Sequence, residues 1–506
     1  MNLNGPCMRQ YKEIKMNCKY KFKTNPYKHQ QTAIDLAGQR RSFGFFMEMG
    51  TGKSKVLIDN LGMLYQAGEV DFALIIAPKG VYRNWVSKEI PEHMSDDVPT
   101  RVIRWVSSAN KAQTEEMRSV KDKFDGLTIF VMNVEAFSTL KGKQAGEWLG
   151  GAFGAKGLIA IDESTTIKNH KAKRSKNLCK IADRFKYKRL LTGSPITKSP
   201  LDIFQQAEFL GKGLLGHESF YTFQMRHAII MKQKMGAKVF NQVMGYKNIE
   251  ELTHKIEQFS YRVLKKDCLD LPDKLYTARY VDLTFEQMQM YENIRKYALQ
   301  MFDDDDSGET AIVTAPAVIT QLLRLQQVLS GHLKTDDGEI ITFPTKRMDA
   351  LKEILQEHDG KAIIWSRFRH DIKMITDMLN KEFGEGCAAA YFGDTSDETR
   401  NNIVKNFQGN NSLKYFVGNP ATAGYGLTLT EADLVIYYAN DFNLETRIQS
   451  EDRAHRIGQK KNVTYIDLIS EDTIDEKIVQ SLKAKIDLGA KVLGEKARQW
   501  LSLTPK

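Results

Sequence analysis

The stretch Met47-Glu48-Met49-Gly50-Thr51-Gly52-Lys53-Ser54 decides the fold of this chain. It is a glycine-flanked turn that runs directly into an apolar, helix-like segment starting at Val56. Glycines let backbone N–H groups curl around a phosphate, the helix start adds partial positive charge, lysine reaches the outer phosphates and serine binds magnesium. The pattern predicts a nucleotide site in which Gly50, Thr51, Gly52 and Lys53 hold phosphate and Ser54 holds Mg²⁺. Met47 stands where the strict P-loop pattern has glycine, so an ordinary glycine turn before a helix is the alternative that this stretch leaves open.

Four short apolar runs follow this turn, at residues 73–77, 128–132, 158–161 and 189–192, with helical stretches between them. Continuous apolar runs are typical of strands buried on both faces of a parallel sheet. Their alternation with helices predicts a βαβ series whose ligands lie at the carboxyl ends of the strands. The predicted fold class is therefore α/β.

Polar residues follow two of these runs. Asp162 and Glu163 end the third run, and phosphoryl transfer needs one carboxylate for Mg²⁺ and a second that orients or deprotonates water. A helix cap is the alternative use of such a pair, and the upstream glycine turn favours the catalytic one. The fourth run ends at Thr192 and Ser194, whose hydroxyls we expect to sense the state of the γ-phosphate.

A second series of apolar runs, at residues 362–365, 388–392, 415–417, 434–438 and 463–468, has no P-loop of its own. It carries Arg453 and Arg456, three residues apart, which predicts that they share one helix face. Two arginines on a domain without a nucleotide site suggest donation across a cleft to a phosphate held by the other domain. A surface ion-pair cluster with Glu451 and Asp452 is the alternative.

The remaining segments carry weaker signals. Residues 201–269 predict helices and no strand, and Asp303–Asp306 predicts a solvated loop. Lysines alternate with aromatic residues over Met1–Asn25, which favours a strand edge guarded by lysines over a grip on phosphate. Gln30 precedes a helical pattern, and a glutamine amide can read both the donor and the acceptor edge of adenine.

Composition indicates the kind of partner and the cellular compartment that the protein has. The 506 residues include 73 Lys and Arg against 63 Asp and Glu, a net charge of +10 that favours a polyanionic partner such as nucleic acid. Five cysteines without metal-ligand spacing predict reduced thiols. No apolar run reaches membrane length and no signal peptide is evident, so we expect a cytoplasmic protein with no membrane partner.

The order and spacing of these motifs resemble superfamily-two helicases, and among them the SWI/SNF-type (Snf-like) DNA translocases, from about Tyr27 to Lys477. The most specific match is residues 451–459, which read Glu-Asp-Arg-Ala-His-Arg-Ile-Gly-Gln. Supporting matches lie at residues 30, 50–54, 84–89, 162–163, 167–169, 191–195, 423–430 and 473–477. The wording of residues 423–430 is nearer the annealing-helicase, fork-remodelling subgroup. Residues 162–165 depart from the family by reading Asp-Glu-Ser-Thr in place of Asp-Glu-Ala-His, and the compact chain resembles prokaryotic or viral members.

The resemblance implies two tandem RecA-like lobes of the P-loop NTPase type, with parallel sheets and helical protrusions between them. The expected boundaries are a basic arm at 1–25, an ATP-binding lobe at 26–203, protrusions and linker at 204–340, a second lobe with the arginine fingers at 341–475, and a C-terminal helix at 476–506.

The resemblance also implies the role of each site residue, with ATP as fuel and Mg²⁺ as cofactor. Gln30 reads adenine, Lys53 and Ser54 hold phosphate and Mg²⁺, Asp162 orders the metal and Glu163 positions water. The remaining implied residues are Arg453 and Arg456 as arginine fingers, Gly426 at the nucleotide, and Thr192, Ser194 and Gln449 in coupling.

The implied partner is DNA, duplex or branched, bound without sequence preference through its backbone. Positions that follow strand ends are the expected contacts: Lys79, Asn133, Arg367 and Gly393. No bromodomain, chromodomain or zinc module is evident, so no histone-reading partner is expected. Two alternatives remain open, an RNA or single-strand unwinding helicase and a non-catalytic clamp that binds ATP without turnover.

Overall fold

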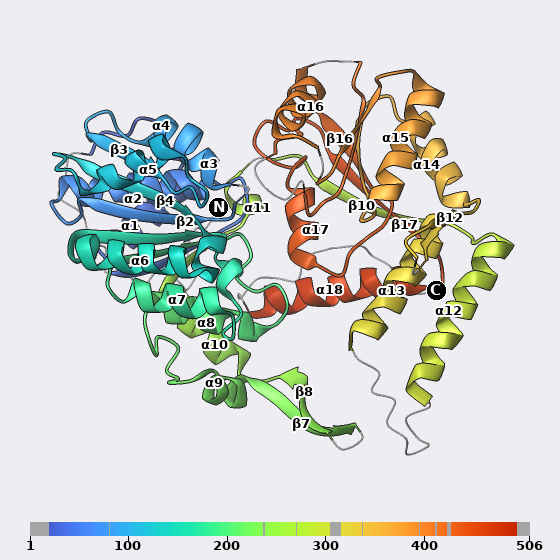
Figure 1. The fold of residues 1–506 in the computed structure, drawn as a ribbon, viewed down its shortest axis with the longest axis horizontal. Helices are drawn as coiled ribbons and strands as arrows, with labels where there is room; N and C mark the ends of the chain where they lie inside the picture. The colour runs from blue at the N-terminus through green and yellow to red at the C-terminus, as the bar shows by residue number, and fades with distance from the viewer. Residues whose placement is uncertain are drawn as a thin grey trace. The chain divides into compact units, whose positions relative to one another are not determined.

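The computed structural model describes residues 20–79, 81–235, 238–269, 271–303, 315–335, 337–393, 395–409, 412–422 and 427–492. The described residues form two compact units, the first mostly from 20–229 and 243–269 and the second mostly from 271–487. Each unit contains its own parallel sheet flanked by helices, which confirms the predicted α/β class (Figure 1).

The sheet of the first unit has the order β3-β4-β2-β5-β6-β1-β9, and all neighbouring strands are parallel. Its strands are β1 (Ser42–Met47), β2 (Phe72–Ala77), β3 (Thr100–Arg104), β4 (Leu127–Asn133), β5 (Gly157–Asp162), β6 (Tyr187–Leu191) and β9 (Ser260–Val263). Every residue of β2 and β5 is buried, because each strand has sheet neighbours on both sides and helices on both faces. The four predicted runs are β2, β4, β5 and β6.

The helices of the first unit are α1 (Lys28–Ala37), α2 (Lys53–Gln66), α3 (Tyr82–Asn84), α4 (Ile90–His93), α5 (Lys111–Arg118), α6 (Leu140–Phe153), α7 (Lys173–Ala182), α8 (Ile203–Leu210), α9 (Phe220–His227), α10 (Ile249–Glu257) and α11 (Lys265–Cys268). Helix α2 buries Val56, Leu57 and Leu61 in the same core as Ile75 of β2. Helices α6 and α7 lie side by side in Figure 1, and Phe153 at the end of α6 stacks on Phe72 of β2 at 4.6 Å.

The prediction that residues 201–269 contain no strand is wrong. Strands β7 (Ala228–Met235) and β8 (Lys238–Tyr246) form a two-stranded sheet, and β9 joins the large sheet beside β1. Residues 228–231 are all apolar although Ile229 and Met231 are about half exposed, so the sequence of this hairpin lacks the alternation of apolar and polar residues that identifies a strand. Strand β9 is only four residues long and depends on its pairing with β1.

The sheet of the second unit has the order β10-β17-β16-β13-β15-β14 and is also parallel throughout. Its strands are β10 (Lys274–Tyr280), β13 (Lys361–Trp365), β14 (Ala388–Tyr391), β15 (Tyr415–Gly418), β16 (Ala432–Tyr437) and β17 (Val463–Ile469). The five runs predicted for this half are β13 to β17. Strand β10, at the edge of the sheet, was not predicted, and its residues alternate between half-buried and exposed.

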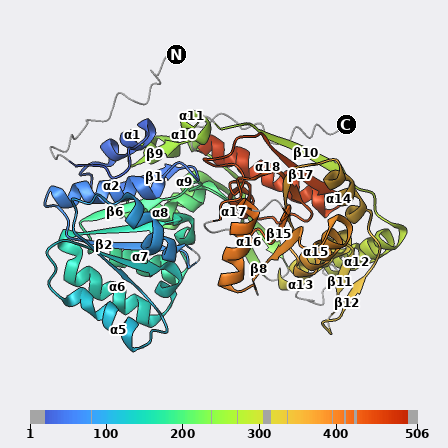
Figure 2. The ribbon, with the colours of Figure 1, turned by 90° about the horizontal axis from the view of Figure 1, so that it is seen from above.

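The helices of the second unit are α12 (Phe285–Asp303), α13 (Ala315–Ser330), α14 (Lys346–Gln356), α15 (Arg369–Phe383), α16 (Asp397–Gly409), α17 (Leu444–Glu451) and α18 (Ile474–Val492), with a small hairpin of β11 (His332–Lys334) and β12 (Ile340–Thr342). Ile478 and Leu482 of α18 pack in one cluster with Ile469 of β17 and Leu444 of α17, and Figure 2 shows α18 running beside β17. Among the described residues, no helix combines the length and apolar character needed to cross a bilayer.

Several expectations fall on residues outside the described ranges. These are residues 1–19 of the basic arm, Asp304 to Asp306, Gly426 and residues 493–506. Residues 20–25 of the arm are described and contain no strand, so the predicted strand edge is absent from that part. Asp303 ends α12 instead of lying in a loop. The division into five segments remains a prediction.

Candidate nucleotide site

The P-loop lies between β1 and α2, at the carboxyl end of a buried strand. Gly50 and Gly52 adopt φ values of +79° and +86°, which side chains other than glycine rarely adopt. The Thr51 hydroxyl donates to the Glu48 carbonyl at 2.7 Å, and Lys53 Nζ donates to the same carbonyl at 3.3 Å. The turn is thereby closed by its own side chains, and the first N–H groups of α2 lie where a helix start can bind an anion.

Asp162 ends β5 and is held by a tryptophan. Trp85 Nε1 donates to Asp162 Oδ2 at 2.9 Å, and the Glu163 N–H donates to Oδ1 at 3.0 Å. Burial raises the pKa of Asp162, while the Trp85 donor and the charge of Lys53 act in the opposite sense. The carboxylate is therefore fixed in direction and close enough to Lys53 to feel its charge.

A π-helical turn at Trp85–Glu89 interrupts the helix formed by α3 and α4, a feature that is frequent at functional sites. Trp85 at its start reaches Asp162, and Glu89 at its end accepts a hydrogen bond from the Ser54 side chain. Burial raises the pKa of Glu89, and the nearby charge of Asp162 raises it further. Ser54, Glu89 and Asp162 thus form a cluster of oxygen ligands beside the P-loop. In the sequence, only the family resemblance pointed to residues 84–89.

Glu163 has left-handed backbone angles, with φ at 51° and ψ at 64°. Such a conformation in a residue other than glycine costs about 1–3 kcal/mol and clusters at functional sites. The next residue, Ser164, donates to Gln206 Oε1 at 2.6 Å, and Gln206 Nε2 donates to the Pro195 carbonyl at 2.7 Å. Gln206 therefore connects the acidic motif to the turn that contains Thr192 and Ser194.

That coupling turn packs against the P-loop. A Cβ atom placed on Gly193 would lie 3.2 Å from the backbone N of Met49. Arg262 of β9 donates to the Gly193 carbonyl at 2.8 Å and to the Phe46 carbonyl at 3.1 Å. The Thr192 hydroxyl accepts from the Ser194 N–H at 3.2 Å. The structure therefore brings Thr192 and Ser194 beside the P-loop. Arg262, which connects this turn to β1, was not predicted from the sequence.

Gln30 lies on α1 and contacts the P-loop directly. Its Nε2 donates to the Thr51 carbonyl at 3.1 Å, and its Oε1 accepts from the Tyr27 N–H at 2.9 Å. A Cβ atom on Gly52 would come within 2.2 Å of Gln30 Nε2, so any other residue would have to displace the Gln30 amide and adopt a φ of +86°. A glutamine amide has two N–H donors and two acceptor lone pairs, which leaves one of each for adenine.

Arg453 and Arg456 converge in the second unit, but the predicted shared helix face is wrong. Helix α17 ends at Glu451, and both arginines follow it in irregular turns. Arg453 Nη1 and Arg456 Nη1 donate to the same Leu427 carbonyl at 3.3 and 3.0 Å, and Arg456 also donates to the Thr428 hydroxyl at 3.0 Å. Gln449 is buried within α17.

The alternative of a surface cluster is also poorly supported, because Glu451 is buried. Glu451 accepts from Arg447 Nε at 2.9 Å and from Lys274 Nζ at 3.1 Å. Arg447 also pairs with Asp467 of β17 through both Nη atoms. This buried network fixes α17 against the sheet, and with it the start of the turns that carry the arginines.

The four expected nucleic-acid contacts lie at strand ends as predicted. Lys79 follows β2 and Asn133 ends the neighbouring strand β4, and Glu135 accepts from the Lys79 N–H at 3.4 Å and from Asn133 Nδ2 at 3.0 Å. In the second unit, Asn419 Nδ2 donates to the Arg367 carbonyl at 2.8 Å. The Gly393 carbonyl accepts from Arg400 at 2.8 Å.

Two parallel sheets and a P-loop with paired carboxylates define an α/β protein of the P-loop nucleotide-binding class. The SNF2-related domain model matches residues 29–332, and the helicase conserved C-terminal domain model matches residues 346–458. The chain belongs to the SNF2-related family. This finding confirms the resemblance to SWI/SNF-type proteins.

Curated relatives are similar over most of the chain. The putative ATP-dependent helicase/translocase YwqA of Bacillus subtilis is 26% identical, over 68% of this chain and 36% of its own length. An uncharacterized ATP-dependent helicase of Mycoplasma pneumoniae is 26% identical, over 90% of this chain and 41% of its own length. The TATA-binding protein-associated factor MOT1 of Saccharomyces cerevisiae is 26% identical, over 66% of this chain and 20% of its own length. The chain thus spans between a fifth and about two fifths of these relatives.

A solved structure of the Sulfolobus solfataricus SWI2/SNF2 ATPase core in complex with dsDNA is 26% identical, with a TM-score of 0.42 and 92% coverage of both chains.

Proposed function

We propose that the protein is a nucleic-acid-dependent ATPase that moves along duplex DNA. One observation carries this proposal. The first unit contains the P-loop and the paired carboxylates, whereas the described part of the second unit shows no P-loop but turns Arg453 and Arg456 onto one carbonyl. ATP hydrolysis of the kind we propose uses both sets of groups.

The first unit supplies the binding and activating groups. Lys53 and the N–H groups of the P-loop would hold the β- and γ-phosphates, and Gln30 would contact adenine through its remaining donor and acceptor. Glu163 would orient the attacking water. Its backbone strain is the expected signature of a side chain held in a working position.

The oxygen cluster of Ser54, Glu89 and Asp162 fits Mg²⁺, which prefers hard oxygen ligands. Burial raises the pKa of both carboxyl groups, and a bound cation would offset that cost. Ser54 and Asp162 would hold the ion, and Glu89 would orient the Ser54 hydroxyl. When bound, Mg²⁺ neutralises charge that develops on the phosphates.

The second unit would complete the site through its arginines. An arginine supplied to the γ-phosphate increases the rate by about 10³ to 10⁵ in related reactions. In the structure one Nη atom of each guanidinium group donates to the Leu427 carbonyl, and a phosphate would replace that carbonyl as acceptor. Gly426 immediately precedes this carbonyl in sequence and would approach the nucleotide with it.

Duplex DNA is the partner that the family and the charge favour. A solved structure with 26% identity is described as a complex with dsDNA, and the net charge of +10 suits a polyanion. Lys79 and Asn133 would touch the backbone from the first unit, and Arg367 and Gly393 from the second. Backbone binding predicts little sequence preference and affinity that falls steeply with salt. Branched DNA is the substrate that the wording of residues 423–430 favours.

The test is ATP hydrolysis with no nucleic acid, duplex DNA, branched DNA, single-stranded DNA or RNA. We expect duplex or branched DNA to give the largest stimulation, and Glu163→Gln to bind ATP but lose at least about 100-fold in rate. Stimulation by RNA or single strands alone would contradict the proposal and indicate an unwinding helicase. Absence of hydrolysis at saturating DNA would indicate a clamp.

A further inference from the structure

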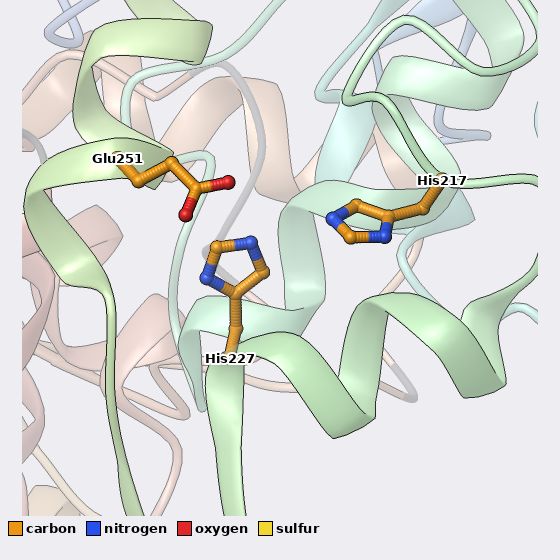
Figure 3. A group of neighbouring side chains, drawn as sticks. All are labelled: His217, His227 and Glu251. Carbon is orange, nitrogen blue, oxygen red and sulfur yellow. The ribbon is translucent and has the colours of Figure 1, made fainter.

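Three side chains that the nucleotide site does not use converge near the hairpin of β7 and β8. His217 lies in the loop before α9, His227 is the last residue of α9, and Glu251 lies in the first turn of α10. Their potential ligand atoms all lie within 4.8 Å of one another. Figure 3 shows the two imidazole rings and the carboxylate facing a common space.

The burial and hydrogen bonding of the histidines are a second, independent observation that points to a ligand. The His227 side chain is fully buried. Within the described part of the chain, neither of its ring nitrogens nor His217 Nε2 meets the geometry of a hydrogen bond, although the Lys247 backbone lies close enough to His227 to raise its pKa. Buried polar atoms are nearly always paired, and a bound ion is one recognised partner of those that no protein group pairs with.

Both imidazoles are suited to act as neutral ligands. Burial lowers the pKa of His217 and of His227, and the positive charge of Lys255 lowers both further, against the opposing effect of Glu251. A neutral imidazole presents one nitrogen lone pair, which is the form that binds metal ions. The two rings together therefore offer two nitrogen ligands without a proton to displace.

Glu251 already has two cationic partners and can still bind a metal. Arg226 donates to Glu251 Oε2 through Nε at 2.9 Å and through Nη2 at 2.6 Å, and Lys255 donates to Oε1 at 2.9 Å. A carboxylate accepts about four such bonds, so one acceptor position remains. The neighbouring cations keep Glu251 ionised, with its pKa lowered to about 2, but their charge also weakens binding of any cation.

We propose that His217, His227 and Glu251 form a binding site for a divalent transition-metal ion of the Zn²⁺ type. Two nitrogens and one carboxylate oxygen suit Zn²⁺ and Co²⁺ and do not suit Mg²⁺. Tetrahedral coordination at about 2.0–2.1 Å places ligand atoms about 3.3 Å apart, so the widest observed separation must close by about 1.5 Å. Glycine accepts a wide range of backbone angles, so we expect Gly213 and Gly216 in the loop before His217 to allow this adjustment.

The metal would join the loop before α9, the end of α9 and the start of α10. These segments form the base from which β7 and β8 continue, since β7 begins directly after His227 and β8 ends three residues before α10. The proposed site is therefore structural in role. It leaves one coordination position for water, which predicts weaker binding than a closed four-ligand zinc site.

The test uses the purified full-length chain, freed of metal by chelator and then dialysed. Co²⁺ is added while visible absorption is recorded, and Zn²⁺ is then added as competitor. We expect one saturable Co²⁺ per chain, displaced by Zn²⁺ and unaffected by excess Mg²⁺. The affinity should fall at least about tenfold in His227→Ala and in Glu251→Gln. His254→Ala, an exposed histidine on the same helix as Glu251, should bind like the parent.

Two further variants keep the proposal open to refutation if His227→Ala does not fold. His217→Ala changes a half-buried loop residue and should also lose Co²⁺, with unchanged DNA-stimulated ATP hydrolysis as the check of folding. Arg226→Gln removes a competing cation and should strengthen Co²⁺ binding. The proposal would be overturned if the parent showed no saturable binding of Co²⁺. It would also be overturned if His217→Ala and Glu251→Gln bound Co²⁺ with the same affinity as the parent, because either result would show an adventitious ion only.

Discussion

Replacing Trp85 with phenylalanine removes the indole N–H that Asp162 Oδ2 accepts at 2.9 Å and leaves most of the apolar packing in place. A hydrogen bond to a charged group contributes about 1.5–3 kcal/mol, which corresponds to about 10- to 150-fold in rate. We expect kcat/KM for DNA-stimulated ATP hydrolysis to fall by a factor in this range. The Mg²⁺ concentration that gives half-maximal activity should rise, because the carboxylate is no longer fixed in direction.

The same variant makes a pH prediction with a definite sign. The Trp85 donor lowers the pKa of Asp162 against the raising effect of burial, so its removal raises that pKa further. The carboxylate then becomes protonated at a higher pH as the solution is acidified. The acidic limb of the rate profile for Trp85→Phe should therefore move to higher pH than that of the parent.

The matched control is Trp105→Phe. Trp105 is buried in the same unit, and its indole N–H has no hydrogen-bond partner among the described residues. Its replacement should leave the rate within about twofold of the parent and the acidic limb in place. Equal losses in the two variants, or an unmoved acidic limb in Trp85→Phe, would refute the role given to this hydrogen bond.

Three further predictions concern other parts of the structure. Gly52→Ala should lose ATP binding, because the φ of Gly52 is +86° and a Cβ would lie 2.2 Å from the Gln30 amide. Gly68→Ala is the control: Gly68 has a φ of +71° with open space around it, so this variant should lose only about 1 kcal/mol of stability. Nucleotide titration and thermal melts measure both variants. Gln206→Leu should keep most ATP hydrolysis but lower the number of DNA steps per ATP, measured by displacement against phosphate release. Arg447→Ala should cost about 3–5 kcal/mol in chemical denaturation, because it leaves Asp467 buried without its cation.

The elements that sequence reasoning found share one property. Strands β2, β4 and β5 are continuous apolar runs because helices cover both faces of the sheet, and the P-loop has a fixed glycine pattern because only glycine accepts its backbone angles. Strands β7 and β9 lacked such signals. One is half exposed on a hairpin and the other becomes a strand only through pairing with distant β1.

The sequence predicted correctly that Arg453 and Arg456 converge, but the physical reason it gave is wrong. The three-residue spacing indicated a shared helix face, but α17 ends before both residues, and the common Leu427 carbonyl brings them together instead. That carbonyl belongs to a segment remote in sequence, so spacing alone could not reveal it.

The clustering of His217, His227 and Glu251 had no sequence signal for the same reason. The third ligand lies on a separate helix beyond a hairpin that was not predicted, so the three residues show none of the short spacings that identify metal sites. Residues that are separated in sequence by an unpredicted hairpin can be seen to lie together only in the three-dimensional structure.

Displacement of a third strand from a triplex on duplex DNA tests the central claim most directly, because it requires ATP-driven movement along the duplex. We expect ATP-dependent displacement by the parent, and none by Lys53→Ala or Arg456→Ala. Arg279→Ala, which breaks only an exposed ion pair with Glu353, should behave like the parent. Displacement that survives in Arg456→Ala, or its absence in a parent protein whose ATP hydrolysis is stimulated by DNA, would contradict the account.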